Sequence, residues 1–328
     1  MFYLSTRVNR EQGRRARARR SAQFALVAAL AAALSMNCAQ LGLDEEDDSD
    51  DTNLLLLSAA AFLNTPVTLN FNVVSGTTNV RCGTNFTVNK AVNGSTTRTM
   101  DPQDLRFYIS NLRMIGADGV SEFPVSFGDD GVWQYSGAAL LDFEDATGSC
   151  SGNADMNMSI SGTSLGGGYR GVVFDLGLPE SLNQLSNTTA PSPLNLNQMY
   201  WSWAIGYKFT KLEFQDTGSS LLMRSHFGSL NCGGDISSNT CANPYRASVR
   251  VTSTSGFNPA TQTIALDMNE LTDSFDTTSS ALSCMPLKSP PAGAPSGDEA
   301  TECPKLLTQM GLDSDGQATG SQAAFVIQ

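Results

Sequence analysis

Apolar and polar residues alternate with a period of two in several segments of this chain, and the alternation limits the folds open to it. Val67, Leu69, Phe71 and Val73 are each separated by one polar residue. Successive side chains of a β-strand point to opposite faces, so this period predicts strands with one buried face. Similar segments are residues 105–110, 169–176, 200–214, 247–254 and 261–268, separated by turns rich in Gly, Asn, Ser and Thr. The sequence therefore predicts an all-β fold.

Residues 65–328 are predicted to form one β domain. They contain no convincing internal repeat and no obvious central linker. All-β folds reach about 200–250 residues or slightly more as a single unit. We expect an antiparallel β-sandwich or a distorted barrel, with long loops stapled by disulfides.

The N-terminus has the features of an export signal. Seven arginines precede an apolar run from Phe24 to Leu34, and Cys38 follows. This run is too short to span a membrane, because a membrane-spanning helix needs about 20 apolar residues. Residues 1–37 are therefore predicted to be a signal peptide that is removed. Cys38 is then the candidate lipidation site of a bacterial lipoprotein. We expect a protein of the periplasm, the outer membrane or the cell surface, held to a membrane by its lipid anchor.

Residues 38–64 are predicted to be the anchor and tether of the domain. Residues 44–51 are acidic except for Ser49, and such a run repels itself and has nothing to bury. The apolar segment 54–62 is too short to cross a membrane and is expected to form a short helix packed on the domain. Without residues 1–37 the chain has 13 basic and 31 acidic residues, a net charge of −18. This charge argues against nucleic acid as a partner.

Cysteine usage agrees with export. Six cysteines remain after Cys38, and an even number in an exported chain predicts disulfides. A thiolate metal site is the alternative, but no two cysteines have the C-x-x-C spacing of a zinc ribbon or redox motif. Six cysteines permit 15 pairings. Proximity along the chain favours Cys232 with Cys241 and Cys284 with Cys303, which leaves Cys82 with Cys150.

The segment from Met199 to Thr210 concentrates the rarer side chains. Two of the three tryptophans, Trp201 and Trp203, occupy alternate positions, and the only histidine, His226, follows downstream. If the segment is one strand, one face carries Met199, Trp201, Trp203, Ile205, Tyr207 and Phe209. This face is either the core side of an ordinary strand or part of a functional site. Likewise, His226 is either a hydrogen-bonded histidine near a disulfide or a metal ligand.

Several motifs occur in a fixed order along the domain. They are residues 104–112, 140–145, 169–179 and 199–209, then His226–Ser229 leading to Cys232, Cys241, Cys284 and Cys303. From about Thr65 to the C-terminus, this ordered set resembles the MbnP-type family, the four-cysteine member of the so-called metallo-mystery pair.

The resemblance implies an exported copper-binding protein that acts in copper capture or handling. It also implies a partner, a di-haem cytochrome related to MauG, which oxidises a tryptophan to kynurenine. Trp201 and Trp203 are the candidates for modification, with Trp201 preferred. His226 is the best direct ligand, Met199 a soft neighbour, and both tryptophan positions belong to the expected metal site. Imidazole and thioether ligands suit copper, Cu(I) in particular.

Two residues depart from the family pattern. The pattern implies histidine where this chain has Gln184 and Tyr200, so two expected copper ligands are missing. The alternative function is a surface lipoprotein, stapled by disulfides, that has lost the metal site and has a structural or protein-interaction role.

Other polar clusters are less specific. Asp142, Glu144 and Asp145 are candidate oxygen ligands for calcium, although acidic residues at a strand end usually form a solvated turn. Asp313 and Asp315 begin like a calcium loop but lack the downstream glutamate in register, so a turn is expected. A single histidine excludes a His-pair zinc motif, and the chain has no Gly-x-Ser-x-Gly elbow. We therefore expect the protein to be a substrate of its partner rather than an enzyme.

Overall fold

The computed structural model describes residues 65–202, 205–232, 241–285 and 298–328. All of them belong to one compact unit, Ala59–Gln328. The predictions for the signal peptide, for Cys38 and for the tether concern residues 1–64 and lie outside the described residues. Within the described residues, no helix is long and apolar enough to cross a membrane.

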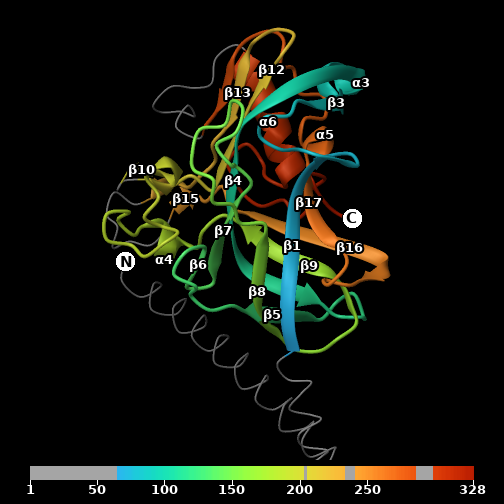
Figure 1. The fold of residues 1–328 in the computed structure, drawn as a ribbon, viewed down its shortest axis with the longest axis vertical. Helices are drawn as coiled ribbons and strands as arrows, with labels where there is room; N and C mark the ends of the chain where they lie inside the picture. The colour runs from blue at the N-terminus through green and yellow to red at the C-terminus, as the bar shows by residue number, and fades with distance from the viewer. Residues whose placement is uncertain (1–64, 203–204, 233–240, 286–297) are drawn as a thin grey trace, which may run out of the picture. The chain divides into compact units, whose positions relative to one another are not determined.

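Strands dominate the described residues (Figure 1). The strands are β1 (Thr65–Ser75), β2 (Thr78–Asn79), β3 (Phe86–Lys90), β4 (Thr96–Ile115), β5 (Glu122–Ser126), β6 (Gln134–Tyr135), β7 (Ala138–Asp142), β8 (Ser159–Ser164), β9 (Tyr169–Leu176), β10 (Tyr200–Ser202), β11 (Gly206–Tyr207), β12 (Thr210–Asp216), β13 (Leu222–Ser225), β14 (Leu230–Cys232), β15 (Cys241–Asn243), β16 (Ala247–Phe257), β17 (Thr263–Asp267), β18 (Leu282–Cys284) and β19 (Phe325–Ile327). The helices are α3 (Ala91–Ser95), α4 (Glu180–Asn183), α5 (Met268–Leu271), α6 (Asp298–Met310) and the 3-10 helix η1 (Asn197–Met199).

Strand β4 is the spine of a 15-stranded sheet. Its first part pairs with β3 and β12, its middle with β7, and its last part with β9 and β5. The register with β9 shifts between Ser110 and Arg113, where Asn111 has a positive φ of 52°. Such an irregularity bends a strand. In Figure 1, β4 accordingly lies between β12 and β13 at one end and β5, β8 and β9 at the other.

The all-β prediction is confirmed. The sheet curls around one core, a geometry between the sandwich and the distorted barrel that the sequence predicts. Most strand pairs are antiparallel, as expected, but β1 pairs with β17 and β13 with β18 in parallel. The predicted strands 169–176, 247–254 and 261–268 correspond to β9, to most of β16, and to β17 with short margins.

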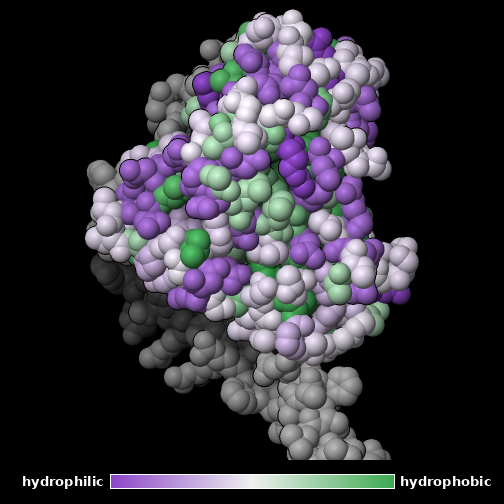
Figure 2. All heavy atoms as spheres, in the orientation of Figure 1, coloured by the Kyte–Doolittle hydropathy of each residue, from purple (hydrophilic) through white to green (hydrophobic). Residues whose placement is uncertain are grey.

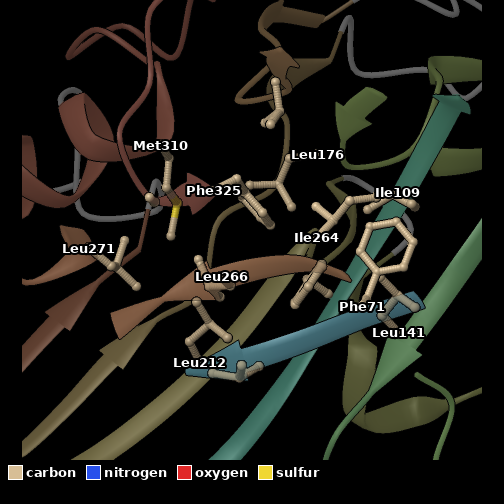
Figure 3. Close-up of a cluster of buried hydrophobic side chains, with 14 of the residues drawn as sticks. Phe71, Ile109, Leu141, Leu176, Leu212, Ile264, Leu266, Leu271, Met310 and Phe325 are labelled. Carbon is tan, nitrogen blue, oxygen red and sulfur yellow. The ribbon is translucent and has the colours of Figure 1, made fainter. Parts of the chain in front are cut away.

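The core lies inside the curl of the sheet. Figure 3 shows side chains from distant parts of the chain pointing toward one another, among them Phe71 of β1, Leu176 of β9 and Phe325 of β19. The rings of Phe174 and Phe325 pack edge to face, with 5.3 Å between their centroids. Burial of each large apolar side chain contributes about 1.5–3 kcal/mol, so this cluster is the main stabilising feature of the domain.

Three disulfides cross-link separate segments of the domain. They are Cys82–Cys150, Cys232–Cys241 and Cys284–Cys303, the pairs that proximity along the chain favours. Cys232–Cys241 links β14 to β15, and Cys284–Cys303 links β18 to α6. On the face shown in Figure 2, hydrophilic residues are widespread and strongly hydrophobic ones are few and separate. The apolar side chains are thus mainly inside.

Candidate metal centre

The segment that carries the tryptophans is a hairpin and not one strand. Met199 ends η1, and β10 turns back into β11 so that Tyr200 pairs with Tyr207. Gly206 has a positive φ of 86°, and a Cβ there would lie 2.1 Å from the carbonyl oxygen of Asn183. Only glycine fits this reversal. The prediction of a continuous aromatic face over residues 199–209 is therefore wrong. Trp203 lies outside the described residues.

Met199 belongs to a second apolar cluster beside the hairpin. The cluster consists of Tyr108, Ala138, Leu140, Leu178, Leu182, Leu194, Met199, Tyr207 and Phe209. Met199 is fully buried in it, whereas Trp201 is only half-buried. The two side chains, which the sequence places on one face, therefore have different surroundings.

Trp201 packs against the chain that follows His226. A Cβ on Gly228 would lie 2.9 Å from Cζ3 of Trp201 and 2.3 Å from the carbonyl oxygen of Tyr207. The indole therefore lies directly over the Gly228 backbone, two residues from His226. The structure thus brings together Trp201 and the His226–Gly228 segment, which are far apart in the sequence.

His226 follows β13 and is held by two contacts. Its backbone N–H donates to the carbonyl oxygen of Cys284 at 3.0 Å, and its Nε2 lies 2.7 Å from Oε1 of Glu213. The side chain is buried, with 6% of its surface exposed. Burial lowers the pKa of His226 below its ordinary value, and this outweighs the opposing effect of the Glu213 hydrogen bond. The imidazole is therefore neutral near pH 7, the form that binds metals.

Glu213 is anionic in this arrangement. Burial alone would raise its pKa, but the hydrogen bond with His226 and the charge of Lys211 lower the pKa to about 2. Lys211 Nζ lies 3.4 Å from Oε1, and Arg224 Nε lies 3.8 Å from Oε2. Lys211 also pairs with the buried Asp104. Sequence reasoning missed Glu213, since a charged residue on a strand usually marks a solvated face.

The family model MbnP matches residues 64–286 of the chain. The chain belongs to the MbnP family. It is also similar to a solved structure, MbnP from Methylosinus trichosporium, with a TM-score of 0.62 and 24% identity over 80% of this chain and 98% of that one. At this identity the likeness shows the shared fold. No curated protein matches the chain.

Of the two positions where the resemblance implies histidine, Gln184 follows α4 beside the hairpin and Tyr200 is the first residue of its strand β10. The side chain of Asn183 connects α4 to the hairpin through two hydrogen bonds. Its Oδ1 accepts from the Tyr207 N–H at 2.9 Å, and its Nδ2 donates to the carbonyl oxygen of Ile205 at 3.0 Å. Gln184 comes next, and within the described residues its buried Oε1 has no hydrogen-bond partner. The ring of Tyr200 packs against that of Tyr207, with 5.0 Å between their centroids. Neither residue supplies an imidazole there.

The acidic residues considered for calcium mostly bind backbone. Asp142 and Glu144 are buried, so the expected solvated turn is wrong for them. Asp142 accepts from the Glu144 N–H, Glu144 from that of Ala146, and Asp145 from that of Thr147. Asp313 caps a turn by accepting from the N–H groups of residues 315 and 317.

His226 remains the best candidate ligand for a metal. Among the described residues, no group of three or more His, Cys, Asp or Glu side chains has the arrangement of a metal site. A site at His226 therefore needs a donor of another kind. The half-buried Trp201 lies on the adjoining backbone of Gly228.

Proposed function

We propose that this MbnP-family protein is an exported copper-binding protein whose site is matured by oxidation of a tryptophan to kynurenine. The observation that carries the proposal is the packing of Trp201 on the backbone that follows His226. It joins the preferred modification site to the preferred ligand. The proposed partner is a MauG-like di-haem cytochrome, which supplies the oxidising equivalents, and the role is copper capture or handling. We place the protein in the periplasm or at the outer membrane or cell surface, anchored through Cys38.

The chemistry of the residues fits copper. A neutral imidazole is a good copper ligand, and kynurenine adds an aromatic amine and a ketone that indole lacks. His226 already makes a carboxylate hydrogen bond through one ring nitrogen, as metal-bound histidines commonly do. Burial of Met199 in the second cluster argues against its direct contact with an ion at His226. Cu(I) is the favoured oxidation state, and calcium at the acidic residues is a secondary possibility.

Copper affinity tests this proposal on protein produced together with the di-haem partner. Replacing His226 by Gln removes the imidazole and is expected to weaken Cu(I) binding by at least about tenfold, measured by competition with a Cu(I) chelator. Gln215→Ala is the matched control, since Gln215 lies on the same strand as Glu213 and its side chain donates to the Ser220 carbonyl, away from His226. An affinity unchanged by H226Q would overturn the proposal.

The second candidate is a surface lipoprotein with a structural or protein-interaction role. Gln184 and Tyr200 favour it, because they stand where the MbnP pattern implies two more copper ligands. In this case the wild-type protein, produced together with the partner, binds Cu(I) no more tightly than the H226Q variant does.

A further inference from the structure

Charged side chains lie on the outer face of β12, and one of them, Glu213, contacts the ring of His226. Thr210, Leu212 and Phe214 of β12 are buried, whereas Lys211 and Glu213 alternate with them on the other face. Glu213 Oε1 is the atom that meets His226 Nε2, at 2.7 Å. The contact joins β12 to the chain that leaves β13.

The carboxylate of Glu213 is fixed from several sides. Lys211 lies beside Oε1 at 3.4 Å, and Arg224 of β13 approaches Oε2 at 3.8 Å. Lys211 is held in turn by Asp104, whose other partner is the guanidinium of Arg106. Asp104 and Arg106 are almost completely buried. Because its neighbours are fixed, the Glu213 carboxylate has a defined position from which to orient the imidazole.

An ionised carboxylate only accepts hydrogen bonds. The ring nitrogen that faces Glu213 must therefore carry the proton, and in a neutral imidazole the other nitrogen then has a free lone pair. The hydrogen bond of the ring within the described residues is made through Nε2. We propose that Glu213 is a positioning residue that holds His226 in the Nε2-protonated tautomer, so that Nδ1 is the nitrogen offered to copper. The metal half of this inference rests on the proposed function.

The presence of one histidine in the chain makes the tautomer directly measurable. Copper-free protein is labelled with ¹⁵N-histidine and purified through a histidine-free tag, so that all ring signals come from His226. At pH 8, above the ordinary histidine pKa of about 6.5, we expect a protonated Nε2 and an unprotonated Nδ1. A protonated Nδ1 in the wild-type protein would overturn the inference.

Three variants separate positioning from general stability. Glu213→Ala removes the acceptor and is expected to give a mixture of both tautomers. Glu213→Gln offers the ring both an oxygen acceptor and an NH2 donor, so it should favour the wild-type tautomer less strongly than Glu213 and more strongly than Ala does. Glu122→Ala is the matched control, because it removes a carboxylate of β5 that pairs with Arg113 of β4 and Arg250 of β16. A wild-type tautomer in folded E213A would contradict the proposal.

Cu(I) is then added to the labelled, matured protein. Since Cu(I) is diamagnetic, the nitrogen that binds it is identified by its changed ¹⁵N shift. We expect the change at Nδ1, and a 10–100-fold weaker affinity in E213A, the usual effect of removing such a partner. A change at Nε2, or equal affinities, would overturn the role of Glu213 and leave the proposed function intact. Absence of Cu(I) binding by the wild-type protein would instead overturn the proposed function, and the metal half of this inference with it.

Discussion

Gly228 sets the approach of Trp201 to the His226 segment. Its missing Cβ allows the indole and the Tyr207 carbonyl to lie against one stretch of backbone. The site therefore depends on a residue that contributes no chemical group.

Substitution of Gly228 by Ala tests this packing. The added methyl group meets a backbone oxygen, which does not move as a flexible side chain would, so we expect a loss of at least about 2 kcal/mol in the free energy of unfolding. Trp201 should also be displaced, which tryptophan fluorescence will detect. Gly167→Ala is the control because no atom lies within 4 Å of its added Cβ. Equal stability of the two variants would show that the close approach is wrong.

At the residue scale, the sequence reveals special side chains better than their surroundings. Trp201 and His226 are recognisable by their rarity and their place in the motif order. Glu213 is not, because one of 32 acidic residues carries no local signal, and Gly228 lies within the 226–229 motif without any sign of what it contacts. The role of Glu213 arises from strand pairing, which places it opposite Arg224, and from its hydrogen bond with His226.

Asp216 stabilises the connection between β12 and β13. Its carboxylate accepts from the Gly218 and Ser219 N–H groups, from the Thr277 hydroxyl and from Arg98 of β4. Burial would raise its pKa, but these hydrogen bonds lower the pKa to about 2 from an ordinary 3.8. A depressed pKa means that the ionised carboxylate stabilises the folded state above pH 3.8, and that this contribution is lost as the pH falls through 2.

We expect Asp216→Asn to lower the free energy of unfolding by about 2 kcal/mol at pH 7, which is the size of the linkage effect for such a shift. The difference from the wild-type protein should shrink as the pH approaches 2. Urea denaturation at pH 7 and at pH 2.5 measures both values. A difference that stays constant between these pH values would refute the assigned cause.

At the element scale, period-two alternation predicts β9 correctly but misses the break at Gly206 and the helix α6. The buried residues Cys303, Leu306, Leu307 and Met310 have helical spacing. Pro304 inside the helix and the Pro- and Gly-rich residues before it favour a loop by local rules. Packing against β18 and the Cys284–Cys303 disulfide outweigh those preferences.

The curl of the sheet is a property of the whole molecule. β1 pairs with β8 and with β17, strands that lie far along the chain, and β17 pairs with β19 at its end. Alternation identifies strands and their buried faces, but it does not say which strands meet. An all-β class was therefore predictable, whereas the long β4 spine and the two parallel pairs were not.

Attachment of the whole protein to a membrane is expected to depend on Cys38, which lies outside the described residues. Cys38→Ser removes the thiol that would carry the lipid, so the variant should move from the membrane fraction to the soluble fraction. Fractionation of cells that express each protein, with labelled fatty acid to detect acylation, measures this. Equal membrane retention and labelling of both proteins would disprove lipidation at this residue.

Peptide mass spectrometry on protein from its native host tests the central claim most directly, because the proposed maturation depends on a partner that recombinant protein would lack. The fragment containing Trp201 and Trp203 is sequenced after copper-limited growth. The account predicts kynurenine in this fragment, with Trp201 as the modified residue. Intact indole at both positions would contradict the matured copper site and favour the structural or interaction role.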